Sequence, residues 1–355
     1  MIICRTPYRI SFFGGGTDYP NWYRNHGGAV LAATIDKYCY LTCRYLPPFF
    51  EHRFRIVYRK IETCRTIDEI EHPVVRETLK RLRFCRGLEL HHDGDLPARS
   101  GMGSSSAFTV GLVNTLDALR GDFRSKQELA EESIYIEQEC VGDMVGCQDQ
   151  VMAAFGGLRC VQFHPSGQIS ADTLAIPQAR GEELQAHLML FYTGISRTSS
   201  DVAKTYVPQL TTRCQQLTSM RRLVDEGIDT LLSGMDIRAF GELLDEGWQL
   251  KRSLSPNISN PHIDELYALA KVAGAIGGKL TGAGGGGFLL FFVPPEKQTA
   301  VKDALNGLIH VPFRFDNAGS RMIHHQPVED FREAEKARER QEITAFQELK
   351  EVSMV

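Results

Sequence analysis

Three glycine-rich segments constrain this chain more than any other feature of its sequence. They lie at residues 14–16, 101–103 and 277–287. Glycine adopts positive φ angles at little cost and lets the backbone approach a ligand or a second loop closely. The total of 32 glycines in 355 residues is only slightly above the usual ~7%. The positions of the glycines are therefore more informative than their number, and each segment adjoins a predicted strand or helix.

The composition indicates a soluble globular protein, and its length predicts two domains. Hydrophobic residues make up 43% of the chain and charged residues 24%. The formal net charge of −4 argues against general nucleic-acid binding but leaves room for a small basic pocket. Nine cysteines without a CxxC pair predict reduced thiols. With no signal-peptide pattern and no long apolar run, we expect a cytoplasmic protein without a membrane span.

Hydrophobic periodicity places the glycine segments at the ends of regular elements. Ser125, with Glu128 three residues later, predicts a capping box at a helix start. Strands are predicted over residues 2–11, 29–45, 88–92, 158–163, 188–192, 288–293 and 311–315. Helices are predicted over residues 68–85, 104–119, 125–140, 147–155, 236–254, 262–273 and 296–308, and residues 200–232 are expected to contain more than one. The charged segment from residue 328 onward is expected to be a peripheral helix or a frayed end.

The first glycine segment follows a predicted strand and reads Phe-Phe-Gly-Gly-Gly-Thr-Asp-Tyr-Pro over residues 12–20. The glycines allow close approach to a ligand, and Asp18 then presents a carboxylate suited to accepting hydrogen bonds from vicinal hydroxyls. A plain strand-terminating turn, capped by Asp18, explains the same residues. The segment alone leaves both interpretations open.

The second segment, Pro-Ala-Arg-Ser-Gly-Met-Gly-Ser-Ser-Ser-Ala over residues 97–107, leads directly into a helix. Backbone N–H groups and the helix dipole would both point at an anion there, and the serine hydroxyls could reach a Mg²⁺ ion bound to phosphates. An ordinary serine-capped helix N-terminus is the alternative. Three serines beside two glycines exceed what a cap needs, so the segment favours phosphate binding.

The third segment contains two motif-like patterns whose context is wrong. Lys279 is followed by Leu280, so the hydroxyl that a P-loop needs comes one residue late. Gly282, Gly284 and Gly287 have the spacing of a dinucleotide-binding motif, but a strand and not a helix follows them. What remains is a glycine loop before a buried strand, suited to packing against another loop or a ligand.

Two acidic residues flank the predicted loop at residues 141–146. Glu137 is late in one helix and Asp149 early in the next, so the turn could bring both carboxylates to one site. The dipole of the second helix would keep Asp149 ionised. Two solvated acids at helix ends are the alternative.

In this order, the segments resemble the GHMP kinase superfamily, which includes galactokinase, homoserine kinase, mevalonate kinase and phosphomevalonate kinase. Residues 7–19 look like the first family motif in its sugar-kinase form, and residues 97–107 match the second, P-x-x-x-G-x-G-S-S-x-A. Residues 279–288 are similar to the third motif, and Glu137 with Asp149 and Gln150 resembles the family's acidic pair. The resemblance covers the chain to about residue 328.

The resemblance implies an α/β protein of two domains with the site in the cleft. Residues 1–183 would form an S5-domain-2-like domain that carries the ATP and sugar motifs. Residues 184–328 would form a ferredoxin-like α+β domain, and residues 329–355 a charged tail. The resemblance also implies ATP as co-substrate, Mg²⁺ as cofactor and a phosphorylated heptose as partner. The charge and the short apolar runs predict no nucleic-acid or membrane partner, and exposed apolar helices could support a homodimer.

The roles of the family residues carry over to the matching positions. Asp149 would orient the acceptor hydroxyl and Arg9 would orient Asp149, so these two are the predicted catalytic residues. Ser104, Ser105 and Glu137 would hold Mg²⁺. The predicted ATP-binding residues are Pro97, Arg99, Ser100, Gly101, Met102, Gly103, Ser104, Ser105 and Ser106. The predicted substrate-binding residues are Gly16, Thr17, Asp18, Arg197, Gly284 and Gly285.

Within the superfamily, residues 12–20, 146–150, 193–197 and 250–252 look most like those of bacterial D-glycero-D-manno-heptose 7-phosphate kinases. Such an enzyme would phosphorylate the anomeric O1 and give the 1,7-bisphosphate, on the path to GDP-heptose and surface polysaccharide. A 7-phosphate needs a cationic pocket. The candidates are Arg197, Lys204, Lys251 and Arg252, with Arg197 the first choice because it follows a strand end and a Thr-Gly turn.

Three other functions stay open. Another sugar 1-kinase, for galactose, fucose or a uronic acid, would share the first motif. A non-catalytic binding protein on this fold is disfavoured by the presence of Arg9, Glu137 and Asp149. A decarboxylase of the mevalonate branch is disfavoured by the sugar-type first motif. Activity against sugars with and without a terminal phosphate would separate the kinases, and ATP turnover would exclude a binding protein.

Overall fold

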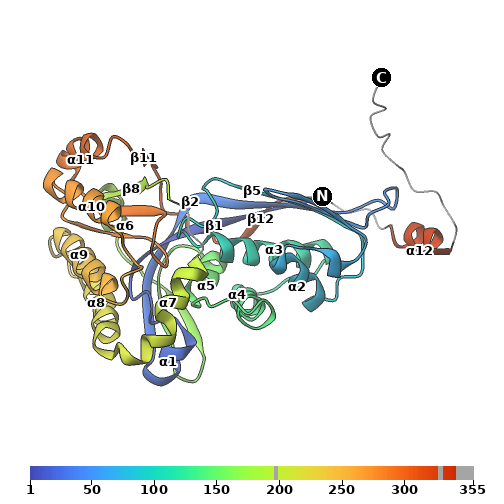
Figure 1. The fold of residues 1–355 in the computed structure, drawn as a ribbon, viewed down its shortest axis with the longest axis horizontal. Coiled ribbons are helices and arrows are strands. Elements are labelled where there is room, and N and C mark those ends of the chain that lie inside the picture. The colour runs from blue at the N-terminus through green and yellow to red at the C-terminus, as the bar shows by residue number, and fades with distance from the viewer. Residues whose placement is uncertain (196–198, 327–330, 341–355) are drawn as a thin grey trace.

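The computed structural model describes residues 1–195, 199–326 and 331–340. Within these residues the strands form one sheet of eight and a second sheet of four. The two sheets follow one another along the long axis of the molecule, and helices cover both (Figure 1). This arrangement confirms the predicted α/β organisation in two domains.

The first sheet has the strand order β12-β1-β2-β5-β3-β4, with β6 paired to the first part of β2 and β7 paired to β6. The long strand β2 pairs with β1 on one side and with β6 and then β5 on the other. The strands are β1 (Ile2–Phe13), β2 (Gly28–Tyr45), β3 (Phe54–Val57), β4 (Ile61–Cys64), β5 (Leu88–Gly94), β6 (Leu158–Phe163), β7 (Ile169–Thr173) and β12 (Arg321–His325). Burial alternates at the start of β1, but every residue in its second half is buried. The second half of β1 is therefore covered on both faces.

Helices cover one face of the first sheet (Figure 1). They are α2 (Pro73–Arg81), α3 (Ser104–Arg120), α4 (Lys126–Tyr135) and α5 (Gln148–Phe155), and a π-turn, η2 (Ile136–Cys140), continues α4. The predicted capping box opens α4, because Ser125 Oγ accepts the Glu128 N–H at 3.2 Å and the Glu128 carboxylate accepts the Ser125 N–H at 2.8 Å. A short helix, α1 (Pro20–His26), lies between β1 and β2, where only a turn was expected.

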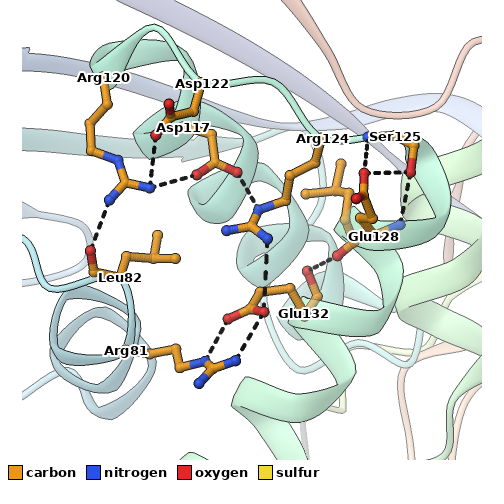
Figure 2. A network of polar contacts seen from close by, with 11 residues as sticks. Arg81, Leu82, Asp117, Arg120, Asp122, Arg124, Ser125, Glu128 and Glu132 are labelled. Atoms are coloured by element: carbon orange, nitrogen blue, oxygen red, sulfur yellow. Dashed lines mark hydrogen bonds and ion pairs between the residues drawn. The ribbon is translucent and has the colours of Figure 1, made fainter.

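A network of charged side chains joins α2, α3 and α4 near the C-terminal end of α3 (Figure 2). Asp117 is buried and accepts hydrogen bonds from Arg120 Nη2 at 3.1 Å and Arg124 Nε at 2.6 Å. Glu132 on α4 accepts from Arg81 Nε on α2 at 2.8 Å. The network fixes the relative positions of these helices.

The second sheet is antiparallel, with the strand order β11-β8-β10-β9. Its strands are β8 (Leu188–Tyr192), β9 (Gly277–Leu280), β10 (Phe288–Phe292) and β11 (Ile309–His310). The helices of this part are α6 (Gln178–Ala186), α7 (Ser199–Tyr206), α8 (Cys214–Leu232), α9 (Arg238–Arg252), α10 (Pro261–Ala273) and α11 (Gln298–Ala304). Helix α9 packs on β9, and α8 packs on α9, β1 and β2. Helices of the second domain therefore cover the buried half of β1.

The structure differs from the predictions near the C-terminal end of the second domain. The predicted strand over residues 311–315 is wrong, because Phe315 forms only an isolated bridge with Ile35. Pro312 lies inside this run and lacks the N–H that a ladder needs. Strand β12, which sequence periodicity does not predict, returns to the first sheet and pairs with β1. The predicted boundary after residue 183 falls within α6.

The charged segment after β12 contains a helix in its described part, α12 (Arg332–Arg340). Glu335 Oε1 accepts the N–H of Gly87 at 3.1 Å, and Arg338 donates to the carbonyl oxygen of Pro48 at 2.8 Å. The helix therefore lies against the first domain, as expected for a peripheral helix. No helix in the described part of the chain is long and apolar enough to cross a membrane.

Candidate active site

The glycine loop before α3 leaves the start of this helix without a side-chain cap. Gly101 and Gly103 have φ angles of 81° and 73°, which favour glycine. Gly103 is the N-cap residue of α3 and makes no side-chain capping hydrogen bond. Ser104 and Ser105 follow it and border the cavity described below. The first-turn N–H groups and the positive end of the helix dipole can therefore bind an anion such as a phosphate.

Arg9 of β1 and Asp149 of α5 form a bidentate ion pair beside this loop. Arg9 Nε donates to Asp149 Oδ1 at 2.6 Å, and Nη2 donates to Oδ2 at 2.7 Å. The remaining Nη1 donates to the carbonyl oxygen of Gly101 at 2.8 Å. The Arg9 side chain is 5% exposed and the Asp149 side chain 23%. Arginine therefore fixes the carboxylate, and the carboxylate keeps lone pairs that can accept a hydrogen bond in the cavity.

Asp18 borders the same cavity, in the turn after β1. It is 1% exposed. Its Oδ1 accepts the N–H of Gly16 at 2.9 Å, and its Oδ2 accepts the N–H of Gln148 at 3.4 Å. Burial raises the pKa of the Asp18 carboxyl, although these backbone donors favour the ionised form. The remaining acceptor sites of Asp18 suit the hydroxyl groups of a polyol.

Thr17 does not border the cavity, contrary to the prediction. Its hydroxyl donates to the carbonyl oxygens of Gly14 at 2.8 Å and Ala29 at 2.9 Å, and it accepts the N–H of Ala29 at 3.2 Å. The side chain is fully buried. Thr17 therefore ties the glycine turn to β2 and has no hydroxyl donor left for a ligand.

Glu137, in the π-turn η2, lies behind the cavity wall. It is 1% exposed, and its carboxylate accepts hydrogen bonds from Ser106 Oγ at 2.9 Å, Thr109 Oγ1 at 2.5 Å and the Gln150 amide. Burial raises the pKa of Glu137 to about 7, against the effect of these three donors. Ser104 and Ser105 were predicted to hold Mg²⁺ together with Glu137, but each residue along a helix turns the side chain by about 100°. That step brings the hydroxyl of Ser106 to Glu137 instead.

The residues at the cavity surface fit Mg²⁺ only together with a nucleotide. Mg²⁺ usually takes one or two carboxylates along with phosphate oxygens and water. Asp149, Ser104 and Ser105 offer oxygen atoms at the surface, whereas Glu137 would first have to release its hydroxyl donors. No group of three His, Cys, Asp or Glu residues in the described ranges is arranged to hold a metal ion alone. A magnesium ion here would depend on the phosphates of a bound nucleotide.

Arg9, Asp18, Asp149 and the start of α3 border one cavity of about 830 Å³. The predicted site residues that border it are Arg9, Gly16, Asp18, Arg99, Gly101, Gly103, Ser104, Ser105, Ser106 and Asp149. Pro97, Ser100 and Met102 do not border it. The carbonyl oxygen of Met102 accepts the N–H of Arg9 at 3.1 Å, which holds the loop against β1. Arg197, the first choice for a sugar phosphate, lies outside the described residues.

The loop between β9 and β10 borders the cavity from the second domain, but not with the predicted glycines. Gly282 borders the cavity and lies so close to Gly101 that a Cβ atom on Gly282 would clash with it. Gly284 and Gly285 pack against Ile258 instead, whose carbonyl oxygen accepts the N–H of Gly285 at 2.9 Å. These two glycines shape the loop and do not reach the cavity.

Of the basic residues predicted to bind a sugar phosphate, the structure brings only one of those it describes to the cavity. Lys251 on α9 borders the cavity, whereas Lys204 and Arg252 do not. Arg252 forms an ion pair with Asp264 at 2.7 Å. Adjacent residues on a helix point to different faces, so Lys251 and Arg252 cannot serve one pocket together.

Several residues at the cavity carry little or no signal in the sequence. Lys279 on β9 borders it, whereas the sequence marked this lysine only as part of a P-loop-like pattern and as the start of the third motif. Tyr19 and Tyr206 also border it, with ring centroids 6.5 Å apart. So do His72 and Phe108, with ring centroids 5.0 Å apart. Isolated aromatic residues look like core residues in a sequence, so only the tertiary structure identifies them.

Two family models match the chain. The model of the GHMP kinases N-terminal domain matches residues 70–157, and the model of the GHMP kinases C-terminal domain matches residues 228–309. The first match includes the uncapped start of α3 and Asp149, and the second includes α9 and the glycine loop after β9. Each match therefore includes residues that border the cavity, although Arg9 and Asp18 lie outside both matched ranges.

Individual proteins agree with these matches. A D-glycero-alpha-D-manno-heptose 7-phosphate kinase of Campylobacter jejuni is 29% identical over 316 residues, which is 85% of this chain and 92% of that protein. A bifunctional fucokinase/GDP-fucose pyrophosphorylase of Arabidopsis thaliana is 29% identical over 320 residues, which is 82% of this chain and 30% of that protein. The crystal structure of a D-glycero-D-manno-heptose 1-phosphate kinase from Bacteroides thetaiotaomicron has a TM-score of 0.76 at 23% identity, covering 92% of this chain and 100% of that one. That likeness shows that the fold is the same.

Proposed function

Because the chain belongs to the GHMP kinases through both of its domains, we propose that it is an ATP-dependent sugar kinase whose active site is the cavity around Arg9 and Asp149. The observation that carries this proposal is the bidentate Arg9–Asp149 pair, which borders the cavity beside the uncapped start of α3. A carboxylate that can orient an acceptor hydroxyl lies there next to backbone donors that can bind phosphates.

In the proposed reaction, the backbone of residues 101–106 binds the phosphates of ATP. Asp149 accepts a hydrogen bond from the acceptor hydroxyl and thereby directs the hydroxyl oxygen at the γ-phosphorus. The new O–P bond forms as the bond to the ADP oxygen breaks, and the hydroxyl proton leaves to Asp149 or to solvent. Phosphoryl transfer depends mainly on positioning and charge, so Arg9 contributes by fixing Asp149. A bound Mg²⁺ supplies charge neutralisation on the phosphates, and Ser104, Ser105 and Asp149 are the residues that would hold it.

We further propose that the acceptor is the anomeric O1 of D-glycero-D-manno-heptose 7-phosphate, which gives the 1,7-bisphosphate. The similarity to the Campylobacter jejuni heptose 7-phosphate kinase extends over 92% of that protein and supports this choice. Asp18 would accept hydrogen bonds from ring hydroxyls. The buried cation Lys251 is compatible with a substrate that carries a negative charge.

Phosphorus NMR after incubation with Mg²⁺, ATP and candidate sugars tests both the substrate and the position of transfer. With heptose 7-phosphate, we expect ADP and a new anomeric phosphate resonance beside that of the 7-phosphate. Unphosphorylated heptose is the matched control. Equal turnover of the two sugars would contradict a role for the 7-phosphate, and absence of ADP with every sugar would contradict the kinase function.

A 1-kinase for an unphosphorylated sugar is the second candidate. The similarity to the Arabidopsis thaliana fucokinase/pyrophosphorylase reaches the same 29% identity over a comparable part of this chain. A comparison of kcat/KM for fucose, galactose and heptose 7-phosphate separates the two. A value for fucose or galactose above that for heptose 7-phosphate would favour this second function.

A further inference from the structure

Two lysines at the cavity are buried without a carboxylate partner. Lys251 on α9 is 8% exposed and Lys279 on β9 is 7% exposed. Within the described ranges these are the only buried lysines, and their ammonium groups donate to backbone carbonyl oxygens and to no carboxylate. Lysine is almost never buried unless its charge is compensated. Both exceptions border the cavity.

The other buried charged side chains of the described residues have either an ionic partner or at least two hydrogen-bond donors. Arg9 pairs with Asp149. Each buried carboxylate accepts at least two hydrogen bonds from N–H or O–H groups, and these carboxylates are Asp18, Glu62, Glu89, Asp117 and Glu137. Among the buried cations of the described residues, the two lysines alone therefore lack an anionic partner.

The ammonium group of Lys251 lies at the junction of two glycine loops. Its Nζ donates to the carbonyl oxygen of Leu280 at 3.2 Å and to that of Gly282. Gly282 in turn packs directly on Gly101, in the loop before α3. An ammonium group has three N–H donors, so the two carbonyl oxygens leave one donor free. Lys251 thus brings a positive charge from the second domain to the loop that is suited to phosphates.

Lys279 adds a second charge to the same wall. Its Nζ donates to the carbonyl oxygen of Phe12 at 2.8 Å, which leaves two N–H donors. Burial lowers the pKa of Lys251 to about 7, and burial together with Lys251 lowers the pKa of Lys279 well below its ordinary range. An anion in the cavity would supply the missing countercharge and raise both pKa values.

We propose that Lys251, together with Lys279, binds a phosphoryl group in the cavity, so that the ligand supplies the countercharge that the protein lacks. This inference rests on the proposed kinase function and names the residues of the second domain that serve it. The phosphoryl group has two possible sources, which share the same chemistry: the γ-phosphate of the nucleotide and the phosphate of a phosphorylated sugar. A phosphate dianion can accept hydrogen bonds from the free N–H groups of either lysine.

Calorimetric binding to the full-length protein distinguishes these sources. Lys251→Met removes the ammonium group but keeps a long side chain. Lys271→Met is the matched control, because Lys271 also donates to a carbonyl oxygen just before β9, that of Ile276 at 2.5 Å, but does not border the cavity. The ligands are a non-hydrolysable ATP analogue and ADP, each with Mg²⁺, and heptose 7-phosphate and unphosphorylated heptose.

For Lys251→Met, we expect the affinity for the ATP analogue or for heptose 7-phosphate to fall at least ~10-fold, while ADP and heptose change less than about threefold. Loss with the ATP analogue assigns Lys251 to the γ-phosphate, and loss with heptose 7-phosphate assigns it to the sugar phosphate. Lys271→Met should bind all four ligands like the wild type. Lys251→Gln keeps a hydrogen-bond donor but removes the charge, and we expect it to lose the same affinity. This variant replaces Lys251→Met in the test if the methionine variant does not fold.

Unchanged affinity of Lys251→Met for both the ATP analogue and heptose 7-phosphate would overturn the proposal. An equal loss with all four ligands would overturn it as well, because it would indicate a general structural role. A wild type that binds none of the ligands would contradict the proposed kinase function and this inference together. A wild type that binds them, with no selective loss in Lys251→Met and Lys251→Gln, would contradict this inference alone.

Discussion

The two ends of helix α3 lie beside different kinds of arginine–carboxylate pair. At the N-terminal end, Asp149 is held by Arg9 and borders the cavity. At the C-terminal end, Asp117 is held by Arg120 and Arg124 and is enclosed by the helices around it (Figure 2). The exposed fraction of the carboxylate side chain is 23% for Asp149 and 3% for Asp117.

The contrast shows that pairing alone does not identify a functional carboxylate. A buried ion pair is costly to break, and one enclosed by protein stabilises a particular arrangement of helices. Asp149 differs because its partner fixes it from one side while the other side remains available to a ligand. We therefore expect substitutions at the two ends to separate catalysis from stability.

Asp149→Asn should give the largest effect. The amide keeps the size of the side chain but removes the charge that orients the acceptor hydroxyl, so kcat should fall by roughly 10³-fold or more. Affinity for an ATP analogue, measured by calorimetry, should change less than about threefold. Turnover at the wild-type rate would remove the basis of the comparison.

Asp117→Ala should reverse this pattern. It leaves two arginines without their buried partner, so the free energy of unfolding should fall by about 3 kcal/mol, measured by chemical denaturation. The kcat of the folded protein should stay within about twofold of the wild type, because nothing at the cavity contacts Asp117. A loss of kcat comparable to that of Asp149→Asn would show that the two ends are coupled.

Glu137 differs from both Asp149 and Asp117, because this buried carboxylate accepts hydrogen bonds from neutral groups only. Its pKa is raised from 4.5 to about 7, so the folded protein holds a proton that the unfolded chain has released between these pH values. The resulting stability is fully present below pH 4.5 and is lost as the pH rises through 7. Relative to Glu137→Gln, which cannot titrate, the wild type should lose on the order of 2–3 kcal/mol over this range. A constant difference between the two proteins from pH 4.5 to 8 would contradict the raised pKa.

Asp18→Asn should affect binding more than turnover. Asparagine offers one acceptor oxygen in place of two, so the KM for the sugar should rise about tenfold while the KM for ATP stays unchanged. Thr17→Ser is the neighbouring control, because its hydroxyl can still reach Gly14 and Ala29. An unchanged sugar KM in Asp18→Asn would rule out the proposed role of Asp18.

Ser125→Ala should give the smallest effect. It removes the capping box at the start of α4 (Figure 2) and should cost about 1 kcal/mol of stability. Both kcat and the sugar KM should match the wild type. A kinetic effect from this variant would mean that α4 contributes to the cavity, which the comparison of the two ends of α3 does not predict.

Local patterns predicted much of the fold and part of the candidate site. The capping box at Ser125 and Glu128 depends on residues three positions apart, and it forms as predicted. The glycine loop before α3 also depends on neighbouring residues, since its positive φ angles at Gly101 and Gly103 require glycine. Arg9 and Asp149 are far apart in the sequence, and the family resemblance, not the local pattern, predicted that they would meet.

The errors arose where the direction of a side chain or a distant partner decides the outcome. Thr17 lies beside Asp18, but the backbone of the turn and of β2 uses its hydroxyl completely. Lys251 and Arg252 are adjacent, and the phase of α9 brings only the first to the cavity. A sequence shows that such residues are close in the chain, but their orientation depends on packing against other elements.

The return of β12 to the first sheet affects how the protein can be made. Strand β1 lies between β2 and β12, so one of its edges remains unpaired until residues 321–325 have left the ribosome. An unpaired strand edge invites association with other chains. Although domains often fold one after another during synthesis, here the first domain receives its last strand after the second has been translated. A fragment that ends near residue 183 would therefore expose this edge, and the nascent chain completes both domains together.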